Sequence, residues 1–62
     1  MILKVFLSVG STLSYAGAYA QLVSLYAGTG TPYAKNKAAG SLGGAVNAGT
    51  IELRNGMYCR VK

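Results

Sequence analysis

The sequence predicts a small α+β protein with an N-terminal strand, one helix, a long arm rich in glycine and alanine, and a C-terminal β-hairpin. Three observations carry this prediction: an alternating aliphatic run near the start, large residues at helical spacing in the middle, and an Asn-Gly turn near the end. The 62 residues form at most one small structural unit. An all-β fold is the alternative, because part of the middle segment also alternates large and small side chains.

The first predicted element is a strand over residues 2–9. Its odd-numbered positions form an aliphatic row and its even-numbered positions a mixed one: Leu3, Val5, Leu7 and Val9 against Ile2, Lys4, Phe6 and Ser8. A period of two with one fully apolar row is typical of a strand that buries one face. We therefore expect the aliphatic row to face the core.

A helix is predicted over residues 12–27, after a break at Gly10. Ser11 or Thr12 can cap its first turn, and Gly28 suits its end. Its large side chains recur at positions i, i+4, i+7 and i+11, which form one helical stripe: Tyr15, Tyr19, Leu22 and Tyr26. A strand over the same residues is the alternative prediction, because Gly17 destabilises a helix by about 1 kcal/mol relative to alanine.

Residues 28–49 are predicted to form an extended arm. Pro32 disfavours a helical conformation at the preceding residue. Between Tyr33 and Gly49 the composition is dominated by alanine, glycine, asparagine and lysine. A loop of this length is uncommon in a small domain unless it is functional or disordered. We expect its conformation to depend on the surface it lies against, and its glycines match neither common phosphate-binding motif.

Residues 50–62 are predicted to form a β-hairpin around Asn55-Gly56, the strongest short-range turn signal. A two-residue turn pairs Leu53 with Tyr58 and scatters the apolar residues over both faces. A three-residue loop pairs Leu53 with Met57 and collects the apolar residues on one face. Because a slip of one residue exchanges the two faces of a strand, burial favours the three-residue loop, and we predict that register.

Thirty consecutive residues, 5–34, carry no charged side chain. Such a segment can cross a bilayer through residues 5–27, be removed as a secretory signal at Ala18-Tyr19-Ala20, or be buried against protein. Its many small and hydroxyl side chains disfavour a single span. One cysteine and no histidine provide neither an internal disulfide nor a zinc site. Contacts with other subunits are the remaining way to stabilise so small a core.

Most catalytic chemistry is excluded by composition. The chain has no histidine, one acidic residue, Glu52, and one cysteine, Cys59. General acid–base catalysis and thiol activation both need a second group that the sequence lacks. We expect Glu52 to offset Arg54 or Arg60 across the hairpin and Cys59 to be a buried apolar residue. No enzymatic activity, cofactor or metal is expected.

The leading functional hypothesis is a structural subunit of a large assembly, a homo- or hetero-oligomer. A bacteriophage virion is the assembly we favour, with the chain as a minor capsid, cement (decoration) or tail protein. Tyrosine is a frequent anchor of protein interfaces. The expected interface residues are the large members of the helical stripe and two further tyrosines: Tyr15, Tyr19, Leu22, Tyr26, Tyr33 and Tyr58.

Two alternatives follow from charge and hydropathy. The net charge of +5 is compatible with nucleic-acid binding as a secondary role. The residues for this role are basic, and Tyr33 and Tyr58 near them are suited to stack on bases: Lys35, Lys37, Arg54, Arg60 and Lys62. The other alternative is a small protein located in a membrane, inserted through residues 5–27 with its basic residues on the cytoplasmic side.

Overall fold

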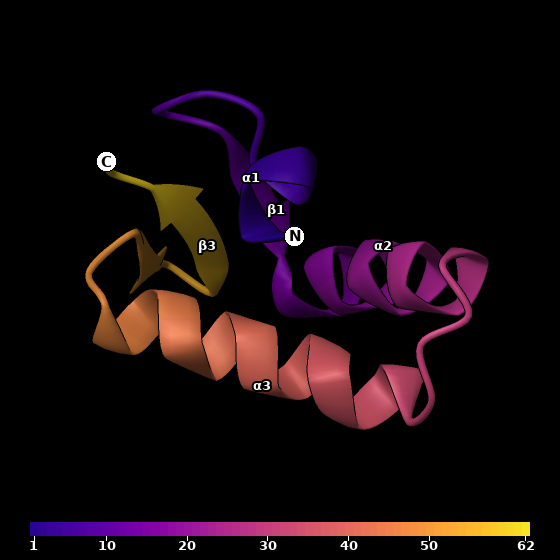
Figure 1. The fold of residues 1–62 in the computed structure, drawn as a ribbon. Helices are drawn as coiled ribbons and strands as arrows, with labels where there is room; N and C mark the ends of the chain where they lie inside the picture. The colour runs from indigo at the N-terminus through magenta and orange to yellow at the C-terminus, as the bar shows by residue number, and fades with distance from the viewer.

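The computed structural model describes all 62 residues as three helices and a three-stranded antiparallel sheet. The elements in chain order are α1 (Ile2–Val5), β1 (Thr12–Ser14), α2 (Tyr15–Gly28), α3 (Ala34–Asn47), β2 (Ile51–Arg54) and β3 (Met57–Arg60). α2 and α3 form a helical hairpin, and α1 and the sheet lie at the end of that hairpin where α3 finishes (Figure 1). The predicted α+β class is confirmed, and the all-β alternative is wrong.

The predicted strand over residues 2–9 is wrong, because Ile2–Val5 form the single helical turn α1. The two neighbours Val5 and Phe6 are both buried, which an alternating strand does not allow. Leu3, Leu7 and Val9, from the expected core row, are instead 55%, 76% and 63% exposed. Short aliphatic runs fit both the helical and the strand period, and here the packing of Phe6 decides between them.

The predicted helix over residues 12–27 is confirmed from Tyr15 onward as α2. Its first three predicted residues form the edge strand β1 instead. The cap is Ser14, whose Oγ accepts a hydrogen bond from the Gly17 N–H at 3.1 Å. A Cβ at Gly17 would lie 3.1 Å from the same oxygen, so the glycine that weakens the helix also makes room for its cap.

The predicted extended arm over residues 28–49 is also wrong, because most of it is the helix α3. Alanine has the highest helix propensity, and the buried residues Ala38, Leu42 and Ala45 are spaced i, i+4 and i+7 on one face. They share a single core cluster with Ala18 and Leu22 of α2. Small side chains on both helices let the two backbones approach closely.

The hairpin is present where it was predicted, but its predicted register is wrong. Leu53 pairs with Tyr58 across a two-residue turn, and β3 lies between β1 and β2. Asn55 and Gly56 have φ values of 51° and 76°, as a type I′ turn requires. The twist of this turn matches that of the strands, and asparagine tolerates the left-handed region, so turn geometry outweighs the burial gained by the other register.

The core consists of eight buried residues from every layer of the fold: Val5, Phe6, Ala18, Leu22, Ala38, Leu42, Ala45 and Ile51. Three of them are alanines, so the apolar area withdrawn from water is small. No helix has both the length and the hydropathy needed to cross a membrane. Residues 5–27 are divided among α1, a loop, β1 and α2.

Candidate functional site

Two open grooves lie along α3, and Ser41 lines both of them. The sheet-side groove has a volume of about 420 Å³ and lies where α3 approaches α1 and the end of the sheet. The turn-side groove has a volume of about 550 Å³ and lies near the connection between α2 and α3.

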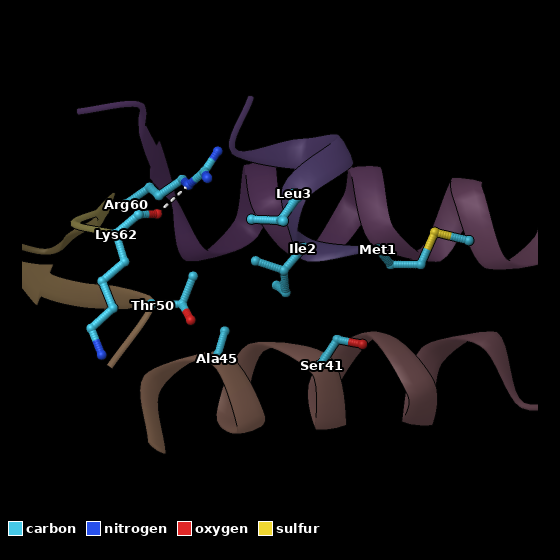
Figure 2. Close-up of a pocket in the computed structure, with 8 residues that line it drawn as sticks. All are labelled: Met1, Ile2, Leu3, Ser41, Ala45, Thr50, Arg60 and Lys62. Carbon is cyan, nitrogen blue, oxygen red and sulfur yellow. Dashed lines mark hydrogen bonds between the residues drawn. The ribbon is translucent and has the colours of Figure 1, made fainter. Parts of the chain in front are cut away.

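The sheet-side groove is apolar along α1 and basic at one end. Figure 2 shows Ile2 between α1 and α3, and Leu3 directed toward the basic residues that close the groove. The lining comes from α1, α3 and the end of the sheet: Met1, Ile2, Leu3, Ser41, Ala45, Thr50, Arg60 and Lys62. Residues nearly sixty positions apart in the sequence therefore share one surface.

The two cationic side chains of the sheet-side groove, Arg60 and Lys62, donate hydrogen bonds to backbone oxygens of other segments. Arg60 Nη1 donates to the Phe6 carbonyl at 3.1 Å and its Nε donates to the Lys62 backbone oxygen at 2.6 Å. Lys62 Nζ reaches the Ala48 carbonyl at 3.4 Å. Arg60 thus ties β3 to the segment after α1. Neither cation has a carboxylate side chain of this chain as a partner.

The only acidic side chain, Glu52, lines neither groove and pairs with Arg54 in the hairpin. Glu52 Oε2 accepts hydrogen bonds from Arg54 at 3.0 Å (Nε) and 2.7 Å (Nη2), so Arg54 is its partner, as one of the two predicted pairings states. Both residues lie on β2, however, so the pair does not cross the hairpin as predicted. The hydrogen bond and charge of Glu52 raise the pKa of the Arg54 guanidinium. Both side chains are more than half exposed, so the pair contributes little to stability. Cys59 is half-buried rather than buried.

The turn-side groove combines aromatic, amide, hydroxyl and basic groups. Its lining residues come from the end of α2, from the residue before α3 and from the first turns of α3: Tyr26, Tyr33, Asn36, Lys37, Gly40 and Ser41. The hydroxyls of Tyr26 and Ser41 hydrogen-bond to each other and join the two helices. Tyr33 precedes α3 in the left-handed conformation, with φ 57° and ψ 44°, and its side chain is 77% exposed.

The residues predicted for nucleic-acid contact fall into two groups. Lys35 and Lys37 lie in the first turn of α3, whereas Arg54, Arg60 and Lys62 lie at the sheet end of the molecule. The 14 residues of α3 separate the groups along a molecule that is 31 Å long. The basic residues therefore do not form one continuous surface. Tyr33 was predicted to stack on bases near the basic residues, and it lines the turn-side groove together with Lys37.

The predicted interface residues also occupy different places. Tyr15 stacks on Tyr19 with ring centroids 5.9 Å apart and contacts Tyr58 at the same centroid distance. Tyr15 is exposed, whereas Leu22 is fully buried within the chain's own core. Asn36 and Ser41 were not predicted as site residues. The spacing of Ala38, Leu42 and Ala45 was the signal that could have placed Asn36 and Ser41 on a helix.

Neither groove is lined by a carboxylate, histidine or cysteine side chain. Their hydroxyl, amide and cationic groups can exchange hydrogen bonds with a ligand and attract anions. Comparisons with protein-family models, with curated proteins and with solved structures found no match to this chain.

Proposed function

We propose that this chain is a non-enzymatic structural subunit that packs against a different protein in a larger assembly. The observation that carries the proposal is the exposure of Leu3, Leu7 and Val9, all more than half accessible within one segment of seven residues. We call this segment, residues 3–9, the N-terminal edge. Large apolar side chains left exposed along one short segment favour an interaction surface there, and a core of only eight residues gains from any further burial.

The charge balance supports a partner of a different kind rather than a second copy. The chain carries a net charge of +5, and its one acidic side chain already pairs with Arg54. Two copies brought face to face have no further carboxylate side chains to offset Arg60 and Lys62. A neighbour with an acidic surface around an apolar patch complements both the N-terminal edge and the adjacent basic end of the sheet-side groove.

A bacteriophage virion is the assembly that we favour, with the chain as a minor capsid, cement or tail protein. Three features support this choice: the small size, the abundance of glycine and alanine, and a composition without the residues of common catalytic sites. Isolation of the particle that contains the chain tests this choice.

The experiment follows the chain in an extract of the cells that produce it naturally, by sedimentation and immunodetection. Wild-type chain is expected in fast-sedimenting particles whose other proteins mass spectrometry identifies. Leu7→Ser is expected to release it, because the polar side chain weakens the apolar contact. Leu53→Ser is the matched control, since Leu53 is 60% exposed but lies in the hairpin.

Three outcomes would overturn the proposal. The first is a wild-type chain that sediments as a free 6.4 kDa monomer. The second is equal release by Leu7→Ser and Leu53→Ser, because then the N-terminal edge has no particular role. Particles that contain only copies of this chain would contradict the inference of an acidic partner.

A further inference from the structure

We propose that the turn-side groove binds single-stranded nucleic acid, with one base stacked on Tyr33 and an adjacent phosphate held by Lys37. The groove lies at the opposite end of α3 from the sheet. It is therefore a second surface, separate from the N-terminal edge that we assign to a protein partner.

The conformation of Tyr33 is the first argument. A bulky residue with positive φ is a genuine outlier, and such backbone strain tends to occur at functional positions. The strain gains no internal packing, because the Tyr33 side chain is 77% exposed and makes no capping hydrogen bond. The backbone thus presents an aromatic ring to solvent beside a groove, which is the arrangement that stacking on an unpaired base requires.

The second argument is electrostatic. Lys35 and Lys37 lie in the first turn of α3, where the positive end of the helix dipole disfavours cations. The first turn contains no acidic residue, and the single carboxylate side chain of the protein is paired with Arg54 in the hairpin. This placement lowers the stability of the free helix. A bound polyanion offsets the unfavourable charge, so these lysines favour an anionic ligand.

The remaining groups of the turn-side groove narrow the ligand class. The Asn36 amide and the Tyr26 and Ser41 hydroxyls can exchange hydrogen bonds with a base edge or a sugar. An acidic peptide would use the lysines but not the exposed ring. Duplex DNA keeps its bases stacked inside the helix, out of reach of Tyr33. A single strand uses the ring, the amide and the cation together, and so fits the groove best.

The test measures binding of fluorescein-labelled dT15 and U15 to the full chain by anisotropy, in salt from 50 to 200 mM. Tyr33→Ala is expected to weaken binding by about 5- to 150-fold, the range for loss of one stacking aromatic, whereas Tyr33→Phe retains it. Lys37→Ala is expected to lower the salt slope by about 0.7, the value for one phosphate contact on a single strand. Lys4→Ala removes the same charge outside the groove and leaves only a small change.

Competitors and folding controls complete the experiment. A labelled 15-residue polyglutamate and a 15-base-pair duplex are measured in parallel, and circular dichroism checks that each variant keeps its helices. If Tyr33→Ala loses its helices, Tyr33→Phe and Lys37→Ala carry the test. Equal binding by wild type and Tyr33→Ala, tighter binding of polyglutamate than of dT15 and U15, or the same salt slope for Lys37→Ala and Lys4→Ala would each overturn the proposal.

Discussion

Leu53 lies directly opposite Tyr58 in the C-terminal hairpin, so only a two-residue turn closes it. This pairing puts Tyr58 on the same face as the buried Ile51 and brings it against Tyr15 of α2. It also puts Met57 and Cys59 on the opposite face. The turn therefore determines which side chains of β3 pack against the core.

The turn itself can be tested by substitution at Gly56. Gly56→Ala is expected to destabilise the protein by about 1–2 kcal/mol, because an L-residue is disfavoured at φ 76°. Asn55→Gly, its control, is expected to change the unfolding free energy little, because glycine adopts φ 51° without strain. Urea unfolding in a sucrose-containing buffer measures both, and NMR contacts that place Leu53 opposite Met57 would contradict the register.

Glycines within α3 provide the converse prediction. Gly43 and Gly44 are helical and exposed, and an added Cβ meets no atom within 4 Å at either position. Gly43→Ala and Gly44→Ala are each expected to stabilise the protein by about 0.5–1 kcal/mol, because alanine loses less backbone entropy in a helix. Gly49→Ala is the opposite case, since Gly49 has φ 76°. Stabilisation by Gly49→Ala would show that this loop conformation is wrong.

The core of α3 is tested by comparing two aliphatic residues. Leu42 is 2% exposed and Val46, one turn later, is 41% exposed. Leu42→Ala is expected to cost about 2–5 kcal/mol, the usual range for a buried leucine, and so to unfold the isolated chain. Val46→Ala is expected to cost much less, and circular dichroism distinguishes the two. Equal losses of helix would mean that α3 does not bury the face described here.

The charge pattern of α3 predicts a trade between stability and binding. Lys35→Glu is expected to raise the unfolding free energy by about 0.5–1 kcal/mol, because a carboxylate interacts favourably with the positive end of the helix. The same change is expected to weaken binding of dT15, because it removes one positive charge and adds a negative one. High salt should reduce both effects. A less stable Lys35→Glu variant would contradict the assigned start of α3.

The sequence predicts those elements whose signal is local. The hairpin follows from Asn55-Gly56, and α2 follows from the spacing of Tyr15, Tyr19 and Tyr26. The α3 helix was missed because its apolar face is made of alanines and one leucine, which contrast weakly with the glycines between them. The N-terminal strand was wrong because the alternating row around Val5 has no strand partner, and the packing of Phe6 selects a helical turn.

In the candidate site, too, features that depend on neighbouring residues could be predicted, and features that depend on the packing of distant segments could not. Tyr33 and Lys37 are close in the sequence, so their proximity could be predicted. The contribution of Tyr26 and Ser41 to the same groove depends on the antiparallel packing of α2 and α3, which no local pattern specifies. The link from Arg60 to the Phe6 carbonyl joins residues 54 positions apart and likewise appears only in the folded chain.

The need for a partner is tested most directly by a thermal melt of the purified chain, at a concentration where sedimentation shows a monomer. The small core and the open N-terminal edge predict a broad transition with little cooperativity near room temperature. Addition of the purified partner should then sharpen the transition and raise its midpoint. A sharp, cooperative melt of the monomer at high temperature would contradict the account.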